Sequence, residues 1–336
     1  MTRIAINGLG RIGRLVLRHF METAPSGVEI IAANDLVPTD DLAYLLKYDS
    51  VHGRAAFPVA ATPNTLQLGD RTIQITAMTE PEKLPWKDMG IDVVLECTGH
   101  FTHRQDAARH LTAGAKRVLI SAPSPDADYT IVLGVNEGGY DAGKHQIISN
   151  ASCTTNSLVP AMKVLLDGFG IEMALVTTIH AYTATQGLVD RPAKKPIRGR
   201  AAAVSLIPTS TGSDIATARV LPELDGRLRA IAVRAPVPDG ALTDINAVLK
   251  KEATAEEVNN AFKRAAEEEP LQGILGYSDE ELVSADIIDD PRSGIVHGLS
   301  TRIVRKKMAK VQVWYDNEFG YSRRLLDVAA MLSLDC

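Results

Sequence analysis

Short apolar runs alternate with amphipathic stretches along the first half of the chain. Residues 3–7 form an apolar run, and residues 12–23 follow it with the spacing of a helix that buries one face. Strand, helix and strand in succession are typical of a doubly wound parallel sheet. The same pattern predicts a helix at 103–115, ended by a glycine, and further strands at 28–35, 72–76, 92–97, 117–121, 130–135 and 146–149.

The hydrophobic pattern changes after residue 153, where longer β-rich runs begin. They indicate a second domain of the α+β class with a mainly antiparallel sheet. The runs lie at 172–183, 227–237, 241–251 and 307–316. Residues 159–170 predict a helix, and Pro160 should kink it or mark its first turns. A capping box of Thr254 and Glu257 predicts the start of a surface helix.

Residues 183–203 show no hydrophobic periodicity. The segment contains two prolines and several basic residues. Because unstructured connections of this length are uncommon inside compact domains and are usually functional, we expect a long ordered loop.

Composition narrows the functional classes. The 336 residues are 45% apolar and 23% charged, which is normal for a globular protein, and the net charge of −5 argues against nucleic-acid or anionic-membrane partners. We see neither a signal peptide nor an apolar segment approaching the ~18 residues of a membrane helix. Three widely spaced cysteines, at 97, 153 and 336, predict no disulfide framework and no metal site, so a reducing cytoplasm is expected.

The stretch "NGLGRIGR" follows the first strand and opens a helix. Gly8, Gly10 and Gly13 give the spacing G-x-G-x-x-G, in which the glycines permit a tight turn, backbone approach to a pyrophosphate and close helix packing. Asp35 ends the second strand, about 20 residues on. A carboxylate there accepts bonds from both ribose hydroxyls and repels a 2′-phosphate, so NAD is favoured over NADP. The other interpretation is a plain glycine-rich turn with a solvated acid.

Cys153 lies among small polar residues in "NASCTTNS", at the predicted start of a helix. A helix N-terminus lowers the pKa of a thiol, and a neighbouring imidazole activates it. His180 ends an apolar strand and is the best partner among eight histidines, although a lone histidine is more often a satisfied structural group. Cys97 lies in an apolar strand and is expected to be an inert core residue.

A dinucleotide site together with an activated thiol favours one reaction. The thiolate adds to an aldehyde, the hemithioacetal gives a hydride to NAD, and the resulting thioester is open to a second nucleophile. A cysteine hydrolase would not need the dinucleotide site, and an alcohol dehydrogenase would not need the thiol.

Several ordered motifs resemble the family of phosphorylating glyceraldehyde-3-phosphate dehydrogenases across essentially the whole chain. These motifs are "INGLGRIGR", "YDSVHGR", "SNASCTTN", "HAYTATQ", "IPTSTG", "LPEL" and "WYDNEFGYS". The resemblance implies oxidation of D-glyceraldehyde 3-phosphate to 1,3-bisphosphoglycerate with NAD and inorganic phosphate. It also implies a Rossmann domain at 1–151, completed by a C-terminal helix at 317–336, and a catalytic domain at 152–316.

The resemblance also implies a role for each matching residue. Cys153 would be the nucleophile and His180 the base. Residues expected to hold inorganic phosphate are Ser152, Thr154, Thr211 and Gly212, with Arg198 nearby, and those expected to hold the substrate's C3 phosphate are Thr183 and Arg234. Residues expected to contact the cofactor are Asn7, Gly8, Gly10, Arg11, Ile12, Gly13, Asp35, Gly99, Ser121, Asn317 and Tyr321. A homotetramer is implied, with the 183–203 loop near a neighbour's cofactor.

The chain departs from the family at three positions. Ser157 replaces a second cysteine that many relatives carry, and a basic residue common near Thr79 is missing. Arg191 stands where relatives often have Leu or Gly, so dual use of NAD and NADP stays open.

Three alternatives remain. An erythrose-4-phosphate dehydrogenase would hydrolyse the thioester with water, although the small donors at 209–212 suit inorganic phosphate better. A semialdehyde dehydrogenase fits less well, because Arg234 and the threonines suit phosphate groups. A binding protein that has lost turnover conflicts with an intact Cys153, His180 and Asn317.

Overall fold

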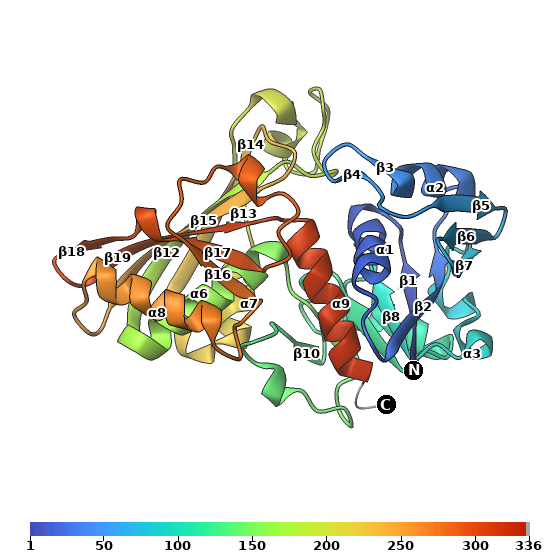
Figure 1. The fold of residues 1–336 in the computed structure, drawn as a ribbon, viewed down its shortest axis with the longest axis horizontal. Coiled ribbons are helices and arrows are strands. Elements are labelled where there is room, and N and C mark those ends of the chain that lie inside the picture. Colours follow the sequence, from blue (N-terminus) through green and yellow to red (C-terminus); the bar gives the residue numbers. More distant parts are fainter. Residues whose placement is uncertain (334–336) are drawn as a thin grey trace. The chain divides into compact units, whose positions relative to one another are not determined.

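The computed structural model describes residues 1–333, which form two compact units. The first unit contains Met1–Ile131, Gly138–Ala151 and the described residues from Ser322 onward, and the second contains Val132–Glu137 and Ser152–Tyr321. The predicted fold class is confirmed: the first unit has a mostly parallel sheet, and the second has a mixed sheet (Figure 1).

The first unit is built on a nine-stranded sheet in the order β10-β11-β9-β8-β1-β2-β7-β6-β5. Every neighbouring pair from β10 to β7 is parallel, and β7-β6-β5 is antiparallel. The strands are β1 (Thr2–Asn7), β2 (Val28–Asn34), β5 (Val59–Thr62), β6 (Thr65–Leu68), β7 (Arg71–Thr76), β8 (Val93–Glu96), β9 (Arg117–Ile120), β10 (Tyr129–Thr130) and β11 (Ile147–Ser149). Chain order reverses at β1, the point where such sheets bind ligands beyond their carboxyl ends.

The first unit has more helices than the two that the sequence predicted at 12–23 and 103–115. The helices are α1 (Arg11–Thr23), α2 (Thr39–Lys47), α3 (Trp86–Met89), α4 (Arg104–Ala107) and α5 (Arg109–Thr112), and a small ribbon pairs β3 (Tyr48–Asp49) with β4 (Gly53–Arg54). The single helix predicted at 103–115 is wrong in detail, because Ala108 separates α4 from α5. The C-terminal helix α9 (Phe319–Ser333) is held in this unit from Ser322 on, where Arg117 donates to the Leu332 carbonyl.

The strand predicted at 130–135 is correct only at its start. After Thr130 the chain leaves the sheet, and the Val132 N–H bonds to the Asn136 side chain in a tight turn. Val132 is fully buried in the core of the second unit, with Leu133 and Val135 packed against it. The apolar run therefore reflects core packing rather than strand pairing.

The second unit is built on an eight-stranded sheet in the order β13-β14-β12-β15-β19-β17-β16, with β18 paired to β19. Two pairs, β12/β14 and β16/β17, are parallel, and the others are antiparallel. The strands are β12 (Ile171–Ala181), β13 (Ile207–Ser210), β14 (Leu228–Ala235), β15 (Ala241–Leu249), β16 (Leu275–Ser278), β17 (Gly294–His297), β18 (Arg302–Val304) and β19 (Met308–Tyr315). The predicted mainly antiparallel sheet is confirmed.

Helices α6 (Cys153–Phe169), α7 (Ser213–Val220) and α8 (Ala255–Glu267) pack against this sheet. Helix α6 continues through Pro160, and α8 begins with the predicted capping box of Thr254 and Glu257. The buried core lies between α6, α8 and the sheet. The 183–203 segment contains only short 3₁₀ turns, Pro196–Gly199 and the start of Ala202–Val204.

Candidate active site

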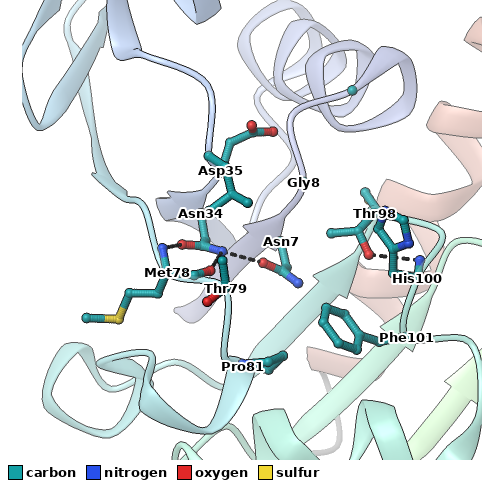
Figure 2. A pocket seen from close by; sticks show the side chains of 13 residues that line it. Asn7, Gly8, Asn34, Asp35, Met78, Thr79, Pro81, Thr98, His100 and Phe101 are labelled. Carbon is teal, nitrogen blue, oxygen red and sulfur yellow. Dashed lines mark hydrogen bonds between the residues drawn. The ribbon is translucent and has the colours of Figure 1, made fainter.

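A cavity of about 440 Å³ lies in the first unit, beyond the carboxyl ends of β1, β2, β7 and β8. Figure 2 shows its lining, in which Asn7, Asn34 and Met78 form a hydrogen-bonded row and Thr98 bonds to His100. Cys97 also lines this cavity, and burial raises the pKa of its thiol to about 12. A thiol with this pKa stays protonated near neutral pH.

The three glycines of the first turn occupy different environments. Gly8 has φ +97°, and a Cβ there would lie 2.8 Å from the Thr98 nitrogen. At Gly13 a Cβ would lie 2.1 Å from the Gly8 carbonyl oxygen, whereas at Gly10 it would meet no atom within 4 Å. Gly10 caps α1 without any side-chain hydrogen bond. The turn therefore leaves an open approach to a helix N-terminus, as a pyrophosphate requires.

Asp35 directly follows β2 and is hydrogen-bonded to this turn. Its carboxylate accepts from the Leu9 N–H at 2.6 Å and from the Val37 N–H at 3.0 Å. Two oxygens in fixed positions beside the cavity suit the two hydroxyls of a ribose.

Other residues predicted to contact the cofactor are placed as follows. Ile12 is the second residue of α1, and Arg11 pairs with Asp49. Gly99 is exposed with φ +71° in open space, and the Ser121 N–H bonds to the Glu96 carbonyl. The Arg11 guanidinium is therefore paired with the Asp49 carboxylate. The space beside Gly99 is open to a ligand.

In the second unit, Cys153 is the first residue of α6, and its Sγ lies 3.4 Å from His180 Nε2. Ser152 caps the helix by accepting from the Thr155 N–H. His180 comes from β12 and is 5% exposed. The thiol and the imidazole predicted from the sequence are thus in contact, at the distance that proton transfer requires.

Strand register brings Arg234 to the same place. Residues 180 and 234 are paired neighbours on β12 and β14. The Arg234 guanidinium lies 2.8 Å from His180 Nδ1 and donates to the Ala181 carbonyl at 2.9 Å, and His180 Nδ1 lies 2.7 Å from that same carbonyl. Because Arg234 can only donate, its contact with Nδ1 and the carbonyl contact favour opposite tautomers. The tautomer protonated at Nδ1 leaves Nε2 as an acceptor for the thiol proton.

The protonation of the pair differs from the sequence expectation. Burial raises the pKa of the Cys153 thiol to about 11, against the lowering effects of Arg234 and of hydrogen bonds from Thr154. Burial and then the Arg234 charge lower the pKa of His180 to about 3. The helix N-terminus is present, but desolvation outweighs it. The pair is therefore neutral without substrate, and the thiol proton leaves as the sulfur attacks.

Tyr315 is a member of this cluster that the sequence analysis missed. Its hydroxyl bonds to Thr154 at 3.0 Å and to Thr178 at 2.8 Å, and its ring meets the His180 ring edge to face at 6.0 Å. Tyr315 is buried at the end of β19. The alternation of apolar and polar residues along β19 predicts that Tyr315 faces inward, but it does not predict which residues its hydroxyl bonds to.

The remaining residues predicted to bind phosphate lie in other segments of the second unit. Arg198 donates to Thr209 at 2.8 Å and to the Ser210 carbonyl at 3.1 Å, and its charge lowers the pKa of Arg234 after the larger effect of burial. Thr183 bonds to Thr185, and Thr211 bonds to Ser213, next to Gly212 at the start of α7. Of the residues predicted to bind phosphate, Thr154 bonds to Cys153 and Arg234 contacts His180. The bonds of Thr183 and Thr211 are to residues two positions along the chain.

Asn317 and Tyr321 lie in the second unit, each 5% exposed. The Asn317 side-chain oxygen is buried and has no hydrogen-bond partner among residues 1–333. A buried acceptor of this kind costs free energy unless a ligand satisfies it. A primary amide, such as the carboxamide of nicotinamide, has the donor it needs.

None of the helices in residues 1–333 is both long enough and apolar enough to cross a bilayer.

Comparisons with known proteins cover both units. Residues 2–104 match the family described as glyceraldehyde 3-phosphate dehydrogenase, NAD binding domain, and residues 152–317 match its C-terminal domain. The prediction of an NAD-binding first domain is thereby confirmed.

Named relatives align over nearly the whole chain. Glyceraldehyde-3-phosphate dehydrogenase 1 of Bacillus subtilis is 50% identical over 332 residues, 99% of this chain and 98% of its own length. The Geobacillus stearothermophilus enzyme has the same identity and coverage. The Streptomyces coelicolor enzyme is 48% identical over 330 residues, 98% of each chain. The chain belongs to the glyceraldehyde-3-phosphate dehydrogenase family.

Proposed function

We propose that this chain catalyses the NAD-dependent, phosphorylating oxidation of D-glyceraldehyde 3-phosphate to 1,3-bisphosphoglycerate. The contact of Cys153 with His180 beside Arg234 carries the proposal, because it combines a nucleophile, a base and a cation for a substrate phosphate. Family membership and the open glycine turn support NAD as the cofactor.

The first step is addition of the Cys153 sulfur to the aldehyde carbon. The thiol proton passes to His180 Nε2 and from there to the aldehyde oxygen, so that the product is a hemithioacetal with a hydroxyl group and His180 is neutral again. His180 Nε2 then takes the proton of that hydroxyl group as the hydride leaves the carbon. NAD, when bound, accepts the hydride that leaves this carbon, so that a thioester remains on Cys153. Small donors on α6, among them the Thr154 backbone and hydroxyl, are positioned to stabilise the carbonyl oxygen.

The second step transfers the acyl group to inorganic phosphate. A phosphate oxygen attacks the thioester carbon, the carbon–sulfur bond breaks, and the sulfur leaves as a thiolate that takes the proton held on His180 Nε2. We assign Ser152, Thr154, Thr211, Gly212 and Arg198 to inorganic phosphate, and Thr183 and Arg234 to the substrate's C3 phosphate. Arginine binds phosphate through paired, charge-assisted hydrogen bonds.

We assign the cofactor to the glycine turn, Asp35, Gly99 and Ser121 in the first unit, and its nicotinamide to Asn317 and Tyr321. Asp35 and Arg191 have opposite effects on NADP binding, because the carboxylate repels a 2′-phosphate and the guanidinium would attract it. In the structure Arg191 donates to the Thr185 carbonyl within its own loop, which supports a preference for NAD. We place the enzyme in the cytoplasm, as the sequence analysis expected.

A homo-oligomer, of four chains in our proposal, is supported by the outer face of the second sheet. Leu175 on β12 and Ile231 on β14 are 67% and 56% exposed, and Met173 is 57% exposed. Large apolar side chains on one sheet face are typical of surfaces that are covered in an assembly.

The decisive experiment follows NADH formation with glyceraldehyde 3-phosphate and NAD, with and without inorganic phosphate. Sustained turnover only with phosphate is the expected result. About one NADH per subunit without phosphate would represent the acyl-enzyme at Cys153. Steady turnover without phosphate would mean that water resolves the thioester, as in an erythrose-4-phosphate dehydrogenase. No NADH in any condition would overturn the proposal.

A further inference from the structure

We propose that Glu96 is a positioning residue that fixes the walls of the cofactor pocket. The inference rests on the proposed use of NAD. Glu96 ends β8 and is 1% exposed, so its carboxylate lies behind the pocket lining rather than in it.

The Glu96 carboxylate accepts from donors on both sides. One oxygen accepts from the Asn7 amide at 2.6 Å and lies 3.0 Å from His110 Nε2. The other accepts from the Thr98 N–H at 2.8 Å and from the Thr98 hydroxyl. Asn7 and Thr98 both line the pocket. One buried group therefore joins the last residue of β1 to the loop after β8.

Trp86 fixes the direction of the His110 bond. Its indole N–H donates to His110 Nδ1 at 3.0 Å, and His110 is fully buried. Since Nδ1 is an acceptor, the imidazole is neutral and carries its proton on Nε2, which donates to Glu96. The contacts of the two carboxylate oxygens with Asn7, His110 and Thr98 are then all bonds donated to Glu96.

The row continues along the pocket floor from Asn7. Asn7 accepts from the Asn34 amide at 2.8 Å, and Asn34 exchanges two hydrogen bonds of 2.9 Å with the Met78 backbone (Figure 2). On the other side, the Thr98 hydroxyl accepts from the His100 N–H at 3.0 Å. Lining residues at or just beyond the carboxyl ends of β1, β2, β7 and β8 are therefore joined by one connected set of bonds: Asn7, Asn34, Met78, Thr98 and His100.

The four contacts at this carboxylate come from three residues that belong to different segments of the unit. A buried polar network in which every member has its partners specifies one arrangement of its side chains, which is what a positioning role requires. Asn7 illustrates this, because its amide is held at both ends and cannot rotate without losing either Glu96 or Asn34.

The test variant is Glu96→Gln, which keeps the shape of the side chain. Either orientation of the new amide places an N–H₂ group against donors, the Thr98 N–H on one side or Asn7 and His110 on the other. We expect the Kd for NAD, measured by calorimetry, to rise at least tenfold (about 1.4 kcal/mol). KM for NAD should rise in parallel, while KM for the aldehyde stays within about twofold.

Two further variants separate positioning from general destabilisation. Val118→Ala removes buried apolar volume from β9 in the same unit and should leave the Kd for NAD unchanged. Trp86→Phe removes the bond that fixes His110, at a residue outside the pocket lining, and should raise the Kd about threefold. It also keeps the inference testable if Glu96→Gln does not fold.

NMR spectroscopy of the Trp86 indole N–H directly detects changes in the hydrogen bonds that link Trp86, His110 and Glu96. The chain has two tryptophans, so the Trp86 indole N–H resonance can be assigned by its loss in Trp86→Phe. Glu96→Gln should shift this resonance without ligand, and NAD should shift it in the wild type. Unchanged NAD affinity in Glu96→Gln, or equal weakening in Val118→Ala, would overturn the positioning role alone. A wild type that does not bind NAD would overturn the proposed function and this inference together.

Discussion

Each unit contains a cluster of buried polar side chains, and the two clusters differ in how many of their polar atoms have hydrogen-bond partners. In the first unit the Glu96 carboxylate accepts from Asn7, His110 and Thr98. In the second unit the Asn317 oxygen is unpaired among residues 1–333, and burial displaces the pKa values of Cys153 and His180. A satisfied cluster holds its members still, whereas an unsatisfied one keeps polar groups available for a ligand. The difference predicts which variants lose activity and which lose stability.

Cys153→Ser should have the largest effect. A serine hydroxyl is a far weaker nucleophile, and nothing in the cluster has the basicity to ionise it, so kcat should fall at least about 10⁴-fold. The unfolding free energy should stay within about 1 kcal/mol, since the group is not part of a satisfied network. Steady-state NADH formation and urea denaturation measure the two quantities. Ser157→Ala, one turn along α6, is the matched control and should keep its activity; equal losses in both would point to a damaged helix.

Glu96→Ala should show the opposite profile. Removal of the acceptor leaves buried donors on Asn7, His110 and Thr98 without this partner, and each donor left unpaired should cost about 1–3 kcal/mol of unfolding free energy. Glu82→Ala is the control in the same unit, because its pairing with Arg109 is roughly one-third exposed. That variant should lose at most about 1 kcal/mol. Similar losses in the two variants would remove the distinction between the clusters.

Features encoded locally were predictable from the sequence. The turn of Gly8, Gly10 and Gly13 and the capping box of Thr254 follow from spacing alone, and both are present. The run at 130–135 misled the prediction, because an apolar run looks the same whether it pairs in a sheet or fills a core.

Contacts between distant residues were not predictable in the same way. Asn7 and Glu96 are 89 positions apart, and Thr154 and Tyr315 are 161 apart, so neither pair leaves a periodic signal. The thiol pKa was expected in the wrong direction for a similar reason. Its value depends on burial by residues that come from other parts of the chain.

Arg234→Lys tests the charged member of the second cluster. Lysine keeps the charge but loses the planar pair of donors, so KM for glyceraldehyde 3-phosphate should rise about 10- to 100-fold. KM for NAD should change little, because we assign Arg234 to the substrate's C3 phosphate and not to the cofactor. Arg229→Lys on the same strand is the control, and its side chain bonds to the Leu228 carbonyl. An unchanged KM for the aldehyde would remove Arg234 from the substrate site.

Asn317→Ala tests whether an unpaired acceptor is retained for a ligand. Since its oxygen has no hydrogen bond to lose within the described residues 1–333, the unfolding free energy should change by less than about 1 kcal/mol. The value of kcat/KM for NAD should fall about tenfold, as expected for one lost hydrogen bond. Asn246→Ala, whose amide bonds to Asp244, should keep its activity. A stability loss larger than the activity loss would contradict the assignment.

Asp49→Asn concerns a charge in the first unit that has its hydrogen-bond partners, and it should change stability with little effect on turnover. Burial opposes ionisation of Asp49, but hydrogen bonds from Arg11, His52 and Val51 prevail and lower its pKa to about 2. The unfolded chain, with an ordinary pKa near 3.9, binds more protons between about pH 2 and 4. The ionised group therefore stabilises the fold fully above pH 4, and this contribution disappears as pH falls through 2. Urea denaturation at several pH values should show the difference between wild type and Asp49→Asn shrinking over that window. Arg11→Gln should weaken the same pH dependence, and a difference that is independent of pH would mean that Asp49 acts through its hydrogen bonds alone.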